Sequence, residues 1–222
     1  MKILNLFSGI GGNRKLWSKE HYITAVECDK NIAQAYSDRF PGDTVIIGDA
    51  KEYLLEHYKE FDFIWASPPC QSHGKVRKAK VDCKPNKKGT TNAIYPDMSL
   101  YEIIIFLQHY FKGKWIVENT SPYYKPLIEP TKILDRHLYW CNFNISDIKI
   151  EKDYKIERVR VSDLTDFDLS KYKNISNKQQ VIRNQVNYKL GNHILNCALN
   201  KIEENIKIIE SELNLFNYSV AS

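Results

Sequence analysis

The sequence lacks the features of a secreted, membrane-spanning or zinc-binding protein. Its 222 residues include five cysteines, an odd number, and no C-x-x-C pair, which argues against a disulfide framework and against a zinc site. No apolar run is long enough to cross a membrane, and the N-terminal stretch becomes glycine-rich too soon for a secretory signal. These absences predict a cytoplasmic protein that holds no metal and does not span a membrane.

The chain is long enough for one large domain, or for one domain with a small appendage. Short apolar runs alternate with helical patterns over its first third. Strands are predicted at residues 2–6, 21–26 and 44–47, with helices at 13–19 and 31–40. This β-α-β-α-β order is typical of a doubly wound, Rossmann-like α/β sheet.

A single cysteine follows an apolar run in the next part of the chain. Residues 61–66 predict a buried strand, which Pro68 and Pro69 end because neither can donate to a sheet ladder. Cys70 is therefore expected at the carboxyl edge of the sheet, where reactive groups of open α/β sheets gather. Most free cysteines are buried as small hydrophobes, and that interpretation stands beside the interpretation as a nucleophile.

Positive charge is concentrated directly after Cys70. Between residues 71 and 93 there is one acid, Asp82, and seven cations: Lys75, Arg77, Lys78, Lys80, Lys84, Lys87 and Lys88. Glycine, proline and asparagine in the same stretch predict a loop. Most charge runs are solvated surface, but a basic loop that begins at a candidate nucleophile favours a lid over nucleic acid.

Two acids follow the second and third predicted strands. Glu27 is placed to bind ribose hydroxyls, and Asp49 to accept from an adenine amino group. The turn at residues 7–12 is G-x-G-G rather than the dinucleotide pattern, and no P-loop lysine follows it. The combination favours an adenosine-bearing cofactor without phosphate, a description that S-adenosylmethionine fits.

A third acid, Glu118, ends the predicted strand 114–117, which follows a predicted amphipathic helix at 97–111. Consecutive strands deliver their carboxyl ends to the same crevice, so Cys70 and Glu118 are expected to face one pocket. A carboxylate raises the pKa of a nearby thiol, so Glu118 is expected to contact the substrate. The alternative is a strand-end acid with only a local hydrogen bond.

Five blocks, in order, resemble the signature motifs of the DNA cytosine-5 methyltransferases. They are residues Leu6–Gly12, Pro68–Gln71, Glu118–Thr120, Arg136–Phe143 and Gln185–Ala198. The resemblance implies a doubly wound S-adenosylmethionine-dependent methyltransferase sheet. Three positions depart from the family pattern. Asn5 replaces an aspartate beneath the glycine turn, Thr120 replaces a valine, and Asp135 and His137 flank Arg136 where the family commonly has two arginines.

The resemblance also implies a mechanism. Cys70 would attack carbon 6 of a flipped-out cytosine, Glu118 would hold nitrogen 3 and the amino group, and Arg136 would contact the exocyclic oxygen. The methyl group would come from S-adenosylmethionine and leave S-adenosylhomocysteine as product. The cofactor would be bound by Phe7, Gly9, Gly11, Gly12, Glu27, Asp49, Leu100 and Asn192. For Phe7 and Leu100 the alternative is simple core packing.

The family's target-recognition region is reduced to a short segment here. We divide the chain into a catalytic and cofactor-binding core at 1–143, a reduced recognition segment at 144–180, and a C-terminal part at 181–222 that completes the core. The expected contacts to double-stranded DNA come from Gln71, Lys75, Arg77, Lys78, Lys80, Arg158 and Arg160. The last two lie in an alternating stretch that equally fits a solvated hairpin. A long helix is predicted at 193–213.

Other functional interpretations stay open. The rivals are a non-catalytic DNA-binding relative that partners an active enzyme, and an enzyme of the same chemistry that acts on RNA or on a free nucleotide. The expected state is a monomer or weak dimer, with a helper subunit as a candidate for target choice. The presence of both Cys70 and Glu118 favours catalysis, and the basic loop favours a polymer substrate.

Overall fold

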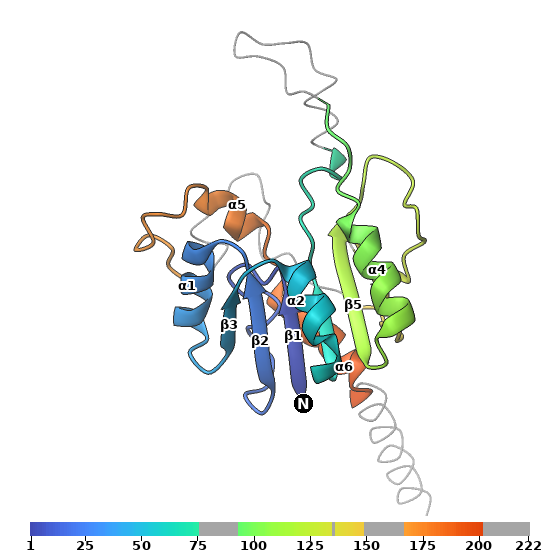
Figure 1. Ribbon diagram of the computed structural model, residues 1–222, viewed down its shortest axis with the longest axis horizontal. Helices are drawn as coiled ribbons and strands as arrows, with labels where there is room; N and C mark the ends of the chain where they lie inside the picture. The colour runs from blue at the N-terminus through green and yellow to red at the C-terminus, as the bar shows by residue number, and fades with distance from the viewer. Residues whose placement is uncertain (76–92, 135, 149–166, 202–222) are drawn as a thin grey trace, which may run out of the picture.

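The computed structural model describes residues 1–75, 93–134, 136–148 and 167–201 (Figure 1). In this part of the chain, one sheet has the strand order β3-β2-β1-β4-β5-β7-β6. The strands are β1 (Lys2–Leu6), β2 (Tyr22–Glu27), β3 (Thr44–Ile47), β4 (Phe63–Ala66), β5 (Lys114–Thr120), β6 (Lys132–Leu134) and β7 (His137–Cys141). The neighbours from β3 to β5 pair in parallel, whereas β7 is antiparallel to both β5 and β6. The predicted doubly wound α/β fold is confirmed.

Helices connect and cover these strands. They are α1 (Lys30–Arg39), α2 (Ala50–His57), the short 3-10 helix η1 (Tyr58–Glu60), α4 (Ser99–Tyr110), α5 (Lys178–Arg183) and α6 (Tyr188–Ala198). Asp29 caps α1 and Asp49 caps α2, and each side chain accepts hydrogen bonds from two backbone N–H groups of the first turn. Among the described helices, none is long and apolar enough to cross a membrane.

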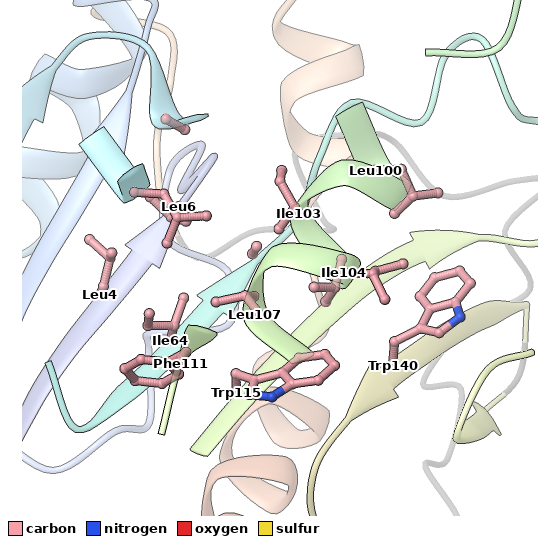
Figure 2. Close-up of a cluster of buried hydrophobic side chains, with 14 of the residues drawn as sticks. Leu4, Leu6, Ile64, Leu100, Ile103, Ile104, Leu107, Phe111, Trp115 and Trp140 are labelled. Atoms are coloured by element: carbon pink, nitrogen blue, oxygen red, sulfur yellow. The ribbon is translucent and has the colours of Figure 1, made fainter. Parts of the chain in front are cut away.

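The sheet has an apolar core on each face, because successive strand residues point to opposite sides. Leu4, Leu6 and Ile64 pack on one side with α4, whose Ile103, Ile104 and Leu107 point at the strands (Figure 2). The alternating residues of the same strands pack on the other side with α6. They include Ile3, Phe63, Trp65 and Ile116, which meet Leu190, Ile194 and Leu195. The carboxyl ends of the parallel strands therefore share one edge between two covered faces.

The prediction of a helix at residues 13–19 is wrong. This segment forms turns, with a hydrogen bond from Trp17 N to Arg14 O of 3.0 Å. Asn13 and Asn5 are both buried, and their amides exchange two hydrogen bonds of 2.9 and 3.3 Å. Buried polar side chains thus determine the backbone here more strongly than helix propensity does. The asparagine at position 5 has a partner beneath the glycine turn.

The predicted C-terminal helix is also corrected. Helix α6 begins at Tyr188, with Asn187 as its cap, and ends at Ala198. Asn200 then has a φ of +58°, a left-handed conformation in which asparagine is enriched. The apolar periodicity of residues 193–199 is real, since Ile194 and Leu195 are buried against the sheet. It does not continue as one helix past Leu199, and residues 202–222 lie outside the described part.

The described end of the predicted recognition segment packs on α1. Leu169 and Ile175 form a small apolar cluster with Ile10, Ala35 and Ile182. The Tyr172 hydroxyl donates to Asp38 of α1 over 2.6 Å. Residues 167–175 therefore cover a helix of the core, and the division of the chain at 144 and 180 stays a prediction.

Candidate active site

The glycine-rich turn after β1 has a left-handed backbone at three positions. The φ angles are +55° at Phe7, +53° at Gly9 and +73° at Gly11. A left-handed phenylalanine is rare, and such residues concentrate at functional sites. The turn brings Phe7 to the carboxyl edge of the sheet, beside the ends of β2 and β4.

The three glycines of this turn have different roles. A Cβ on Gly11 would lie 2.4 Å from the Phe40 ring, and one on Gly12 would lie 2.6 Å from the Val186 carbonyl oxygen. These two glycines therefore let neighbouring segments pack closely. A Cβ on Gly9 would meet nothing within 4 Å, so Gly9 leaves open space where a ligand can approach the backbone.

A cavity of about 360 Å³ lies beside this turn, a volume in the range of small-molecule sites. Its walls come from the turn, the ends of β2 and β3, the start of α2, the turn after β4, and the N-terminus of α4. The lining residues are Phe7, Val26, Glu27, Cys28, Gly48, Asp49, Ala50, Lys51, Pro69, Asp97 and Ser99.

The predicted cofactor acids both lie in this lining. One Glu27 carboxylate oxygen accepts from Gly9 N over 3.0 Å, and the other accepts from Asp29 N over 3.0 Å. One Asp49 oxygen accepts from Lys51 N and Glu52 N at the start of α2. Backbone donors thus fix both carboxylates at the cavity. Lys51 forms an ion pair with Glu102 at the same wall.

Five of the predicted cofactor residues are not in this lining. Gly9, Gly11 and Gly12 belong to the adjacent turn, and Leu100 and Asn192 lie elsewhere. Leu100 is 2% exposed and packs in the core beneath α4, with Ile103 and Trp140 in the same cluster (Figure 2). Asn192 is half-buried on α6. Neither belongs to the cavity lining in the described part of the chain. Sequence reasoning missed Asp97 and Ser99, because nothing in the sequence brings the N-terminus of α4 to the end of β2. It also gave no role to Cys28, which directly follows Glu27.

The turn that carries Cys70 is held by its neighbours at the sheet edge. The Asn119 side chain of β5 donates to the Pro68 carbonyl over 3.0 Å. Backbone N–H groups of His73 and Gly74 donate to the Cys70 carbonyl, each over 3.1 Å. The Cys70 side chain is half-buried, and Pro69 forms part of the cavity wall. The candidate nucleophile therefore follows directly after a cavity residue.

Glu118 is buried at the end of β5, with 7% of its surface exposed. Burial raises the pKa of its carboxyl to about 7, although a hydrogen bond from the Ser67 hydroxyl and the Arg136 charge oppose the shift. His137 Nε2 lies 3.6 Å from a Glu118 oxygen, diagonally across the antiparallel β5–β7 pair. At neutral pH a carboxyl with this pKa is protonated in about half of the molecules.

The predicted catalytic residues influence one another electrostatically. Burial and the Glu118 charge raise the pKa of the Cys70 thiol, whereas Arg136 lowers it. Arg136 is exposed just before β7, and its backbone carbonyl accepts from Ser121 N over 2.9 Å. The structure thus brings Cys70, Glu118 and Arg136 to the same edge, as expected from the sequence. Sequence reasoning named His137 only as a neighbour of Arg136 and gave it no role.

The predicted DNA contacts are only partly described. Gln71 and Lys75 are exposed in the turn that follows Cys70. Arg77, Lys78, Lys80, Arg158 and Arg160 lie outside the described residues.

Fold and site together define a Rossmann-like α/β protein whose strand-end cavity borders a cysteine turn. Residues 1–93 of the chain match the family model of the C-5 cytosine-specific DNA methylases. The matched stretch contains the glycine turn, Glu27, Asp49 and Cys70. The family resemblance is therefore confirmed for this part of the chain. No curated protein sequence matches the chain significantly.

Solved structures resemble the chain over part of its length. A mutant of DNMT2 from Spodoptera frugiperda is 25% identical, with a TM-score of 0.38, over 54% of this chain and 35% of that one. A putative DNA modification methyltransferase from an Escherichia coli prophage is 18% identical, with a TM-score of 0.37, over 56% of this chain and 33% of that one. A hypothetical protein of Thermus thermophilus is 15% identical, with a TM-score of 0.43, over 63% of this chain and 73% of that one. The chain thus spans about a third of the length of the first two.

Proposed function

We propose that this protein transfers a methyl group from S-adenosylmethionine to carbon 5 of cytosine in double-stranded DNA, with Cys70 as nucleophile. One observation carries the proposal. Pro69 lines the cavity, and the next residue is a half-buried thiol whose pKa responds to the charges of Glu118 and Arg136. A bound methyl donor would therefore lie beside a nucleophile and an acid.

The cavity residues fit S-adenosylmethionine. Glu27 is held by two backbone donors and presents a carboxylate suited to ribose hydroxyls. Asp49 presents a second carboxylate suited to an adenine amino group. The open face of Gly9 lets the ligand approach the turn, and Lys51 forms an ion pair with Glu102 at the wall. When bound, the cofactor would supply an electrophilic methyl group to the neighbouring crevice.

Cys70 begins the reaction because cytosine carbon 5 is a poor nucleophile on its own. Its thiolate forms a bond to carbon 6, and the electron pair of the 5,6 double bond becomes available at carbon 5. Carbon 5 then accepts the methyl group. Transfer of the carbon 5 proton to solvent water restores the double bond and expels the Cys70 thiolate. Covalent attack thus activates the ring and is fully reversed at the end.

Glu118 and Arg136 stabilise the charge that this attack creates. A Glu118 carboxyl with a pKa of about 7 is protonated often enough to donate to ring nitrogen 3, while its other oxygen accepts from the amino group. Arg136 would donate to the exocyclic oxygen. A protonated Glu118 also removes the negative charge that raises the pKa of the Cys70 thiol. Substrate binding and thiolate formation are therefore coupled through this acid.

Two features support double-stranded DNA as the substrate: the position of the target atom within a base pair and the positive charge near Cys70. Carbon 6 is inaccessible in a stacked duplex, so the base must be flipped out to reach Cys70. Gln71 and Lys75 are exposed in the turn after the nucleophile and would contact the opened strand. The remaining cations of residues 77–88 would extend this contact to phosphates. An intracellular location, a monomeric or weakly dimeric state, and target choice by residues 144–180 or by a helper subunit belong to the same proposal.

The test is covalent trapping. We expect duplex DNA containing 5-fluorocytosine to form a denaturation-resistant adduct in the presence of S-adenosylmethionine, because fluorine cannot leave as a proton does. Cys70→Ala is expected to abolish the adduct while cofactor binding, measured by calorimetry, is unchanged. Cys28→Ala removes the other described thiol near the cavity and is expected to leave the adduct intact.

Each rival interpretation predicts a different trapping result. Adducts on fluorinated RNA but not on DNA would move the substrate to RNA. Cofactor binding without an adduct on any polymer would support a non-catalytic relative. An adduct that persists in the Cys70→Ala variant would show that the nucleophile is wrong.

A further inference from the structure

A buried histidine joins the nucleophile turn to the end of the neighbouring strand. His73 is 1% exposed and lies three residues after Cys70. Its backbone N–H donates to the Cys70 carbonyl over 3.1 Å, and its own carbonyl accepts from Tyr123 N over 3.0 Å. Its ring nitrogen Nδ1 is hydrogen-bonded to the Tyr124 hydroxyl. Tyr123 and Tyr124 follow β5, which carries Glu118.

The hydroxyls behind His73 form a chain with one direction. The Leu127 backbone N–H donates to the Tyr101 hydroxyl over 3.2 Å, and Tyr101 in turn donates to the Tyr124 hydroxyl over 3.4 Å. The Tyr124 proton is then free to point at His73 Nδ1. An Nδ1 that accepts this proton belongs to a neutral imidazole, and burial, which lowers the pKa of His73, favours the same neutral form. Nδ1 is therefore the last acceptor of a hydrogen-bond chain that starts at the Leu127 backbone N–H and passes through Tyr101 of α4 and Tyr124.

The residues on either side of His73 make two further contacts with neighbouring segments. The Ser72 hydroxyl accepts from Asp97 N over 2.9 Å, and Asp97 lines the cavity. Gly74 forms an isolated antiparallel bridge with Pro122. The turn at residues 70–75 is thus attached on one side to the cavity wall and on the other to the continuation of β5. His73 lies between Ser72 and Gly74, the residues that make these two attachments, and its side chain is buried.

We propose that His73 is a positioning residue that fixes the Cys70 thiol relative to Glu118 through its hydrogen bond to Tyr124. The expected effect of His73 on catalysis rests on the proposed methyl transfer. The effect of His73 on the position of the Cys70 thiol does not. Nothing in the reaction requires His73 to touch the substrate.

The chemistry of the site supports a specific role rather than simple packing. An apolar ring would fill the same space without burying two nitrogens. His73 Nε2 is buried and makes no hydrogen bond of good geometry within the described residues. Burying an unsatisfied polar atom is unfavourable. An apolar ring would lose the Nδ1 bond to Tyr124 and a weaker polar interaction with the Asp97 backbone. That bond ties the nucleophile turn to the strand that holds the acid.

The test removes the bond from each side. His73→Phe keeps a ring of similar size without the acceptor, and Tyr124→Phe removes the donor. We expect either change to lower kcat by about tenfold to 100-fold, the range for a misplaced catalytic group, with the KM and Kd for S-adenosylmethionine unchanged. The double variant is expected to be no slower than the slower single variant, because both changes break one interaction.

Two further variants separate positioning from general damage. His73→Asn offers an amide oxygen near the place of Nδ1 and is expected to recover part of kcat. Tyr123→Phe removes the hydroxyl of the adjacent ring, which packs edge-on against Tyr124, and is expected to leave kcat unchanged. A proportional loss of cofactor affinity in His73→Phe, or multiplicative losses in the double variant, would overturn the inference.

Alkylation of Cys70 keeps this test independent of the proposed function. The rate of iodoacetamide labelling at Cys70, followed by peptide mass, requires neither DNA nor cofactor. A loosened turn exposes the half-buried thiol, so labelling is expected to accelerate in His73→Phe and Tyr124→Phe, while labelling at Cys28 stays constant. Unchanged labelling at Cys70 would refute the role of His73 even if the protein methylates DNA. Accelerated labelling without any methyl transfer would uphold it and count against the proposed function alone.

Discussion

Two groups of acids end strands of the same sheet, and their surroundings differ sharply. Glu27 and Asp49, after β2 and β3, present carboxylates that backbone N–H groups hold at a cavity. Glu118, at the end of β5, is buried beside Ser67, Arg136 and His137, and its pKa is raised to about 7. Backbone N–H groups hold Glu27 and Asp49 in place at the cavity, whereas burial of Glu118 yields a carboxyl that exchanges its proton near neutral pH. The acids at this edge of the sheet thus differ in the groups that hold them and in their exposure, and the proposed roles of cofactor binding and proton transfer depend on that difference.

The largest expected effect of this difference is on the methyl-transfer rate of Glu118→Gln. The amide cannot protonate ring nitrogen 3, so we expect kcat to fall by about 100-fold to 1000-fold, as for other lost transition-state donors. Cofactor affinity, measured by calorimetry, is expected to stay the same because Glu118 is not part of the cavity lining. Glu129→Gln, which changes an exposed acid, is the control. A decrease in kcat of less than about tenfold would remove Glu118 from the reaction.

The same variant should change the pH dependence of stability. The folded-state pKa of about 7 exceeds the ordinary value of 4.5, so the folded protein binds more protons than the unfolded chain between these values. This stability is fully present below about pH 4.5 and is lost as the pH rises through about 7. Denaturant unfolding should therefore show that Glu118→Gln gains about 2 to 3 kcal/mol relative to the wild type between about pH 5 and about pH 8. Equal pH profiles would mean that Glu118 is not buried as a carboxyl.

The sequence predicts the parts of the site that depend on strand ends. Parallel strands separated by helices place their carboxyl ends at one edge. This argument predicted Cys70 and Glu118 at that edge, where the Glu118 charge influences the Cys70 thiol, and Glu27 and Asp49 follow from the ends of two further strands. The predicted helix at 13–19 failed because the Asn5–Asn13 amide pair and the buried Arg14 and Trp17 hold turns there. Those contacts link residues whose pairing has no local signal. The single helix at 193–213 failed for a local reason, the left-handed backbone at Asn200.

Packing between distant elements accounts for the other omissions. Asp97 and Ser99 reach the cavity because α4 lies over β1, β4 and β5, and Leu100 turns into the core for the same reason (Figure 2). Periodicity indicates which residues of a helix are apolar, but not which end of the helix meets a cavity. Likewise, the β5–β7 register places His137 beside Glu118. That register depends on how β7 aligns with β5, and the sequence of the two strands alone does not determine this alignment.

The smallest expected effect distinguishes Asp49 from an acid with an equivalent structural role. Asp49 and Asp29 both cap helices with a carboxylate that accepts from two backbone N–H groups, but only Asp49 belongs to the cavity lining. Asparagine caps helices about as well as aspartate, so both Asp→Asn changes should alter unfolding free energy by less than about 0.5 kcal/mol. Asp49→Asn replaces an acceptor with a donor and should weaken S-adenosylmethionine binding about tenfold, because an adenine amino group would lose its acceptor. Asp29→Asn should bind the cofactor normally. Equal cofactor affinities in the two variants would show that Asp49 only caps α2.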